Sequence, residues 1–155
     1  ESYMKNIFGT LNLNYAFENV KLQSITSYND VQRSTFGDLD FTEVFFLDQG
    51  ETNDTKSFNQ ELRLTNSNTG SKLNWSLGGF YQNVERPFFQ SDFTLSDEFA
   101  VTDYTNTIST LALFGFVDYK LTDKLTASFG LRYDQDNLDG DRGDFRPASF
   151  PENET

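Results

Sequence analysis

The chain has no cysteine and no histidine among its 155 residues, and it has only one methionine, one tryptophan and three prolines. The two absences exclude disulfides, thiolate nucleophiles and histidine-based acid–base catalysis within the chain. Long hydrophobic runs are also missing, because no segment approaches the roughly 18 apolar residues that a membrane helix needs. A β-barrel needs no such run, since only alternate residues of its strands face lipid.

Basic residues are scarce relative to acidic ones, with 12 Lys and Arg against 24 Asp and Glu and a net charge of −12. This balance argues against a nucleic-acid partner, because proteins that bind nucleic acids carry basic patches. The acidity is concentrated in residues 30–57, 84–107 and 134–155, whose net charges are −5, −4 and −5. No catalytic motif is present, and we expect neither an enzyme nor a cofactor.

Six stretches alternate apolar with polar residues. In the clearest, from Leu125 to Tyr133, alternate positions hold Leu, Ala, Phe, Leu and Tyr, and the positions between hold Thr, Ser, Gly and Arg. Successive side chains of a strand point to opposite faces, so this pattern predicts a strand with one apolar and one polar face. The same pattern predicts strands over residues 7–15, 20–28, 58–65, 73–81, 108–121 and 125–133.

The connections between these strands alternate between short and long. Residues 17–19, 66–71 and 122–124 have the composition of tight turns, whereas residues 30–56, 84–106 and 135–155 are predicted to be long extracellular loops. Unequal connections on the two sides of the sheet are typical of outer-membrane barrels. We therefore expect an all-β, antiparallel up-and-down meander of about six strands within a large transmembrane β-barrel.

Aromatic residues are predicted to lie at both ends of the strands, on the apolar face. Tyr and Trp favour membrane interfaces, where the ring is in an apolar layer and its polar group reaches water. We expect one band near the short turns, formed by Tyr15, Phe17, Trp75 and Tyr119. We expect a second band near the long loops, formed by Tyr28, Phe58, Tyr81 and Tyr133.

Two other interpretations remain open. A soluble acidic β-sandwich that binds carbohydrate would also alternate, although its core would need bulky residues where this chain has Gly9, Gly79, Gly115 and Ala127. A passive porin segment is a further alternative. Extraction separates the sandwich from the barrel, because a soluble module stays monomeric without detergent.

Six strands are fewer than the roughly eight with which outer-membrane barrels begin. An open sheet in lipid leaves two edges of unpaired backbone groups, each costing several kcal/mol. The chain also opens on Glu1-Ser2-Tyr3 without the basic and then apolar leader of an exported protein. These observations predict an internal segment of a larger barrel, without a plug domain of its own.

Candidate binding residues lie in the expected loops. Arg86, Phe88, Phe89 and Tyr104 combine a cation with aromatic rings and are candidates for ligand contact. Asp136, Asp139 and Asp141 are a weak Ca²⁺ candidate, because Ca²⁺ prefers carboxylate oxygens but the spacing around Gly140 does not match an EF-hand. We expect no metal site, and for Glu61 and Arg63 we expect a polar network rather than substrate binding.

Several segments together resemble the TonB-dependent receptors. The segment Ser57-Phe58-Asn59-Gln60-Glu61-Leu62-Arg63-Leu64, followed by Leu73-Asn74-Trp75-Ser76-Leu77-Gly78-Gly79-Phe80-Tyr81, is similar to a strand pair of that family. The segments from Leu111 to Thr126 and from Gly130 to Asp134 are similar to its next hairpin, and Ile25-Thr26-Ser27-Tyr28 to an earlier strand. The resemblance implies a 22-stranded barrel in the bacterial outer membrane, in contact with lipid and filled by a plug. It also implies uptake of a siderophore or another scarce nutrient, powered by the inner-membrane TonB complex through the plug.

Overall fold

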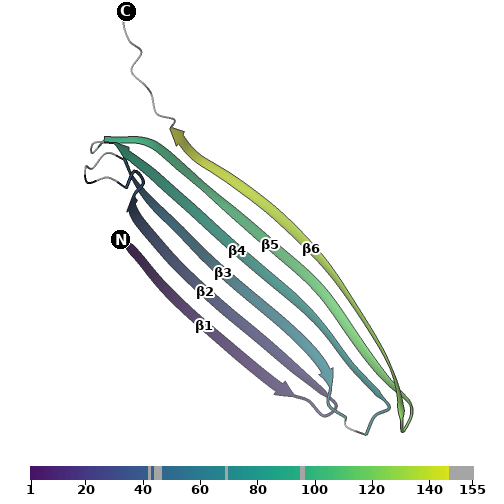
Figure 1. Ribbon diagram of the computed structural model, residues 1–155. Coiled ribbons are helices and arrows are strands. Elements are labelled where there is room, and N and C mark those ends of the chain that lie inside the picture. The colour runs from purple at the N-terminus through teal and green to yellow at the C-terminus, as the bar shows by residue number, and fades with distance from the viewer. Residues whose placement is uncertain (42, 44–46, 69, 95–96, 147–155) are drawn as a thin grey trace, which may run out of the picture.

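The computed structural model describes residues 1–41, 43, 47–68, 70–94 and 97–146. They form a single antiparallel sheet whose six strands follow the order of the chain. The strands are β1 (Ser2–Ala16), β2 (Val20–Asp38), β3 (Leu47–Asn66), β4 (Leu73–Thr94), β5 (Asp97–Thr122) and β6 (Leu125–Arg146). Figure 1 shows them side by side in one layer, which confirms the predicted meander. Among the described residues no helix is long and apolar enough to cross a membrane.

The strands are much longer than the alternation pattern predicted. Residues 30–38, 47–56, 84–94, 97–106 and 135–146 were expected in loops but belong to the sheet. The β2–β3 ladder, for example, continues without a break in register to the pair Asp38–Asp48. Strands pair through backbone hydrogen bonds, which do not depend on the side chains. A strand of mostly polar residues therefore lacks the apolar alternation from which strands were predicted. Of the expected loop over 135–155, residues 147–155 lie outside the described part of the chain.

Tight turns connect the strands at one end of the sheet, called here the short-turn end. The backbone N–H of Phe17 donates to the carbonyl of Val20 at 2.8 Å and closes the β1–β2 turn. Between β3 and β4, the Asn66 side-chain oxygen accepts from the backbone N–H of Trp75 at 2.8 Å. Asp123 and Lys124 connect β5 to β6. The opposite end is called the far end.

The tip of the β2–β3 hairpin at the far end carries three close carboxylates. Asp38 accepts hydrogen bonds from the backbone N–H groups of Asp40 at 2.9 Å and Phe41 at 3.0 Å. Asp48, its cross-strand partner, is 4% exposed. Burial raises the pKa of Asp48, and the charges of Asp38 and Asp40 raise it further. An ionised Asp48 at neutral pH therefore destabilises this part of the hairpin, first through its burial and then through repulsion from Asp38 and Asp40.

One layer of strands has almost no core of its own. Among the described residues the buried apolar side chains are those of Val101 and Ala112. Leu113, by contrast, is 61% exposed, and Phe129 and Leu131 are each 69% exposed. The soluble-sandwich alternative requires a second sheet over these side chains, and the described residues form only one sheet. The apolar face therefore needs a partner outside this segment.

Candidate functional site

The cross-strand register places the apolar positions of all six strands on one face, called the apolar face. One row of directly paired residues runs through Tyr15, Leu22, Leu64, Leu77, Gly115 and Leu131. The next row toward the far end contains Leu13, Leu62, Gly79, Leu113 and Tyr133. Side chains that are paired directly across strands point to the same side of the sheet. An apolar band therefore crosses the whole sheet, and it is interrupted on β2 and β3 by Ser24, Thr26 and Gln60, where the Gln60 side chain hydrogen-bonds to the other two.

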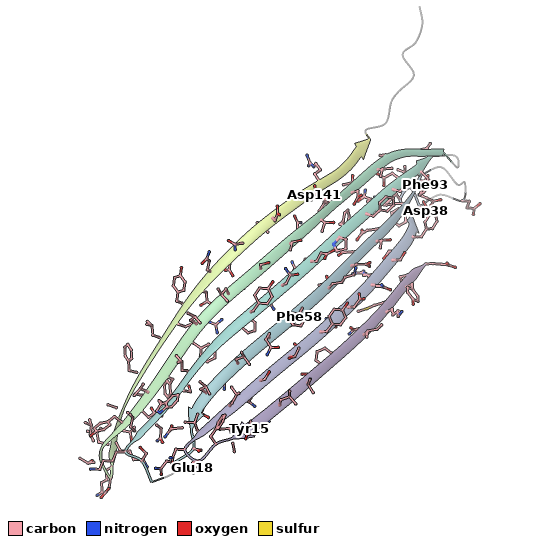
Figure 2. The ribbon with its side chains drawn as sticks, turned by 180° about the vertical axis from the view of Figure 1, so that it is seen from behind. Tyr15, Glu18, Asp38, Phe58, Phe93 and Asp141 are labelled. Atoms are coloured by element: carbon pink, nitrogen blue, oxygen red, sulfur yellow. The ribbon has the colours of Figure 1, made fainter. Side chains whose placement is uncertain are left out.

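The predicted aromatic residues border this band on both sides. Figure 2 shows Tyr15 near Glu18 at the short-turn end and Phe58 partway along the sheet, well short of Asp38 and Phe93 at the far end. Tyr28 and Phe58 are paired directly, and the rings of Phe58 and Tyr81 lie 6.5 Å apart. At the short-turn end Phe17 lies in the turn, with its ring 4.6 Å from that of Tyr15. The strands continue beyond the second aromatic band as polar extensions.

Both aromatic bands shift in the same direction across the sheet. Relative to the row that contains Tyr15, Trp75 lies one row nearer the short turns and Tyr119 lies two rows nearer. Relative to the row of Tyr28 and Phe58, Tyr81 lies one row nearer the short turns and Tyr133 two rows nearer. Parallel displacement of two borders is expected where tilted strands cross a layer of constant thickness. The register thus gives the geometry of a barrel wall in a bilayer.

The opposite face, called the polar face, carries two ion pairs beside one aromatic ring at the level of the apolar band. Arg63 pairs with Glu61 at 2.6 Å, and Arg132 pairs with Asp134 at 2.7 Å. The guanidinium carbons of the two arginines lie 5.6 and 5.9 Å from the centre of the Phe114 ring. The expected polar network of Glu61 and Arg63 is therefore present, and an aromatic ring is part of it.

The Phe114 ring rests on Gly78 of the neighbouring strand. A Cβ added to Gly78 would lie 2.7 Å from Cε2 of this ring and 2.9 Å from the carbonyl oxygen of Leu62. Both distances are too short for real contacts, so only glycine fits under the ring. Phe114 is an apolar residue on the otherwise polar face, and its ring packs against Gly78 of the adjacent strand.

Three of the four predicted ligand residues come together on the polar face beyond the apolar band. Arg86, Phe88 and Tyr104 line a hollow of about 400 Å³, together with Asn53, Thr55 and Asn106. The Phe88 and Tyr104 rings are stacked, with centroids 4.8 Å apart and planes at 24°. This set of six residues is called the aromatic hollow. Its rings, amides and guanidinium can bind a ligand by stacking, hydrogen bonding and charge.

Phe89 does not share the hollow. It is paired with Thr52 and Asp103, whereas Phe88 is paired with Asn53 and Tyr104. Adjacent residues of a strand alternate between faces, so Phe89 points to the other side of the sheet, where it is 43% exposed. The grouping of Phe89 with the other candidates was wrong because the segment was expected to be a loop.

The weak Ca²⁺ candidate is separated in the same way. Asp136 is paired with Thr110, whose hydroxyl donates to it at 2.6 Å on the polar face. Asp139 and Asp141 are an odd number of residues away and lie on the opposite face. Within the described residues, no group of three or more carboxylates could hold a metal ion. These three aspartates cannot bind one cation together.

Sequence reasoning missed the residues that complete the hollow and its surroundings. Asn53, Thr55 and Asn106 line it, and Arg33 and Arg142 lie in the same row as Phe88. The sequence contained the necessary information, because residues separated by an even number of positions in a strand point to the same face. It could be used only once residues 30–38, 47–56 and 135–146 were known to be strands.

A single sheet with one lipid-type face, two staggered aromatic bands and a polar inner face defines a wall segment of an outer-membrane β-barrel. The chain matches the family described as TonB dependent receptor-like, beta-barrel over residues 2–154. It belongs to that family, whose members are proteins of the bacterial outer membrane.

A solved structure agrees with this assignment. The ferric yersiniabactin uptake receptor FyuA from Yersinia pestis is similar to this chain with a TM-score of 0.70 at 19% sequence identity. The alignment covers 92% of this chain and 24% of that receptor. The likeness confirms the fold, and the chain spans about a quarter of the receptor that it matches.

Proposed function

We propose that this chain is part of the barrel wall of an outer-membrane transporter that takes up a scarce nutrient such as a siderophore. The observation that carries the proposal is the pair of staggered aromatic bands around one apolar band, together with family membership over residues 2–154. Lipid contacts the apolar face, and the polar face surrounds a plug supplied by another part of the receptor. The inner-membrane TonB complex supplies energy through that plug.

Neighbouring strands complete the ring on both sides of the segment. Within the described residues β1 and β6 are each paired on one side only. In hydrocarbon every unsatisfied backbone group costs several kcal/mol, so both edges must find partners. Closure as a barrel of about 22 strands satisfies them.

The far end of the sheet faces outside the cell in this proposal. Outer-membrane barrels have short periplasmic turns and longer extracellular segments. The turns at the short-turn end are only a few residues long, whereas the strands extend far beyond the second aromatic band. The aromatic hollow then lies in the outer mouth of the barrel, where an arriving nutrient is first bound.

Energised uptake distinguishes this function from passive diffusion. We would measure growth on limiting iron, on a corrinoid and on an oligosaccharide in cells with the full-length receptor, without it, and without TonB. The proposal expects that growth on one of these nutrients requires both the receptor and TonB. Growth that requires the receptor but not TonB would favour the passive porin segment instead.

A further inference from the structure

Three arginines gather around the aromatic hollow on the polar face. One cross-strand row runs over five strands, through Arg33, Asn53, Phe88, Tyr104 and Arg142. Arg86 lies two residues before Phe88 and is paired with Asn106, so it points to the same side. Arg86 therefore lines the hollow itself, and Arg33 and Arg142 lie on the same face in the row that crosses it, so that three strands each contribute one arginine.

These three arginines have no ion-pair partner within the described part of the chain. The ion pairs there are made by Arg63 and Arg132, closer to the short turns. The two rows that contain the three arginines hold no acidic residue. Arg33, Arg86 and Arg142 are all exposed. Their charges are available to a bound group.

The opposite side of the same strand extensions has the opposite charge. At the level of the hollow the register there places six acids against two lysines, namely Asp30, Asp54, Glu85, Asp103, Asp139 and Asp141 against Lys5 and Lys56. At the level of the hollow the outer side of the wall is therefore acidic and the inner side is basic, and on the inner side Glu51 and Asp92 lie nearer the far end. A wall charged in this way attracts anions toward its inner side.

The stacked rings add a second requirement on the ligand. Phe88 and Tyr104 lie nearly parallel and half-buried beside Arg86. An aromatic surface of this kind favours a flat conjugated group, because such groups stack with offset ring faces. Guanidinium groups bind carboxylate or phenolate oxygens through paired charge-assisted hydrogen bonds.

We propose that the aromatic hollow receives an anionic ligand with a flat conjugated ring, such as an aromatic carboxylate or phenolate chelate, rather than a neutral sugar. Phe88 and Tyr104 stack on the ring, and Arg33, Arg86 and Arg142 bind its negative oxygens. The inference rests on the proposed function, because it takes the hollow to be in the outer mouth of a nutrient transporter. A neutral sugar would make no use of these three positive charges.

Calorimetric titration of the full-length receptor in non-ionic detergent tests this ligand class. The probes are iron(III) tris-catecholate, which is anionic and has flat rings, iron(III) citrate, which is anionic without rings, and maltotriose, which is neutral. The wild-type receptor is expected to bind the catecholate most tightly and the sugar least. R86Q is expected to weaken both anions about ten- to a hundred-fold through loss of charge-assisted hydrogen bonds. F88L is expected to weaken only the catecholate, by about two- to ten-fold.

Lys56→Gln is the matched control. It removes one positive charge at nearly the same level, but from the opposite face. A general electrostatic effect would make K56Q as damaging as R86Q, and that result would overturn the proposal. Wild-type binding of maltotriose as tight as of the two anions, or no binding of either anion, would also overturn it. So would an R86Q receptor with lower folding stability and unchanged binding, because the arginine would then pair with another part of the receptor.

Different results would reject the proposed transport function and the proposed ligand class. TonB-dependent growth on a neutral oligosaccharide, with no binding of either anion, would leave the transport function standing and reject the anionic ligand. Tight, Arg86-dependent binding of the catecholate, with growth independent of TonB, would support the site and reject energised uptake.

Discussion

Arginine substitutions at Leu11 and at its neighbour Asn12 should reveal which face of β1 contacts lipid, because only the substitution on the lipid side should lower stability strongly. Leu11 is 55% exposed on the apolar face, and it lies two rows from Tyr15 toward the row of Tyr28 and Phe58. Its neighbour Asn12 lies at almost the same depth and points to the polar face. The pair Leu11→Arg and Asn12→Arg therefore compares one charge at one depth in lipid and in the barrel interior.

The expected costs differ because the surroundings differ. An arginine on the lipid face near the bilayer midplane costs about 2–4 kcal/mol, which lowers the ratio of folded to unfolded receptor by roughly 30- to 1,000-fold. At Asn12 the substitution removes hydrogen bonds accepted from Asn14 at 3.0 Å and Gln23 at 3.4 Å. Loss of these exposed bonds costs at most about 1 kcal/mol.

Reversible urea unfolding of the full-length receptor in phosphatidylcholine vesicles measures both costs. The midpoint for Leu11→Arg should fall well below that of the wild type, and the midpoint for Asn12→Arg should stay close to it. Equal losses for the two variants, or a larger loss at Asn12, would refute the assignment of lipid to the apolar face.

Three further outcomes follow from individual contacts. Gly78→Ala should cost about 1–3 kcal/mol of stability in the same unfolding assay, because its Cβ meets the Phe114 ring. Gly9→Ala should change the stability little, because the space there is open. Equal costs for the two variants would contradict the close packing of the Phe114 ring on Gly78. Asp48→Asn should raise the protection of the β2–β3 tip against amide hydrogen exchange at pH 7. Lowering the pH should raise this protection, taken relative to the intrinsic exchange rate at each pH, in the wild type only. The raised pKa means that the folded tip binds a proton more readily than the unfolded chain, so its stability rises as pH falls. Protection that neither change raises would contradict a destabilising charge on Asp48. Thr110→Val should cost about 1 kcal/mol by removing the donor to Asp136, and an unchanged unfolding midpoint would show that this bond contributes nothing.

Several features could be predicted from the sequence because they depend only on the alternation of side chains between the two faces of a strand. A strand such as 125–133 must place Leu131 and Tyr133 on one face and Arg132 on the other, whatever lies around it. The composition of the turns, with Asn66 before β4 and Asp123 before β6, fixed the short connections. Strands, faces, turns and order together were enough to identify a barrel wall.

The extent of the strands depended on pairing between distant segments. Thr52 and Gln90 carry no apolar alternation, and they belong to strands because the backbone of each pairs with a neighbouring strand. Parity within residues 84–106 was uninformative until that pairing was known. For this reason Phe89 was grouped with Phe88, and Asp136 with Asp139.

The sequence by itself determined that the chain makes two-faced strands, because side-chain direction alternates at every residue of an extended backbone. Only the tertiary structure decided which strands meet at which residue, because register is set by hydrogen bonds between segments far apart in the chain. That register brings Arg33, Phe88 and Arg142 into one row and seats Phe114 on Gly78. It also staggers the two aromatic bands together, as a tilted wall in a membrane requires.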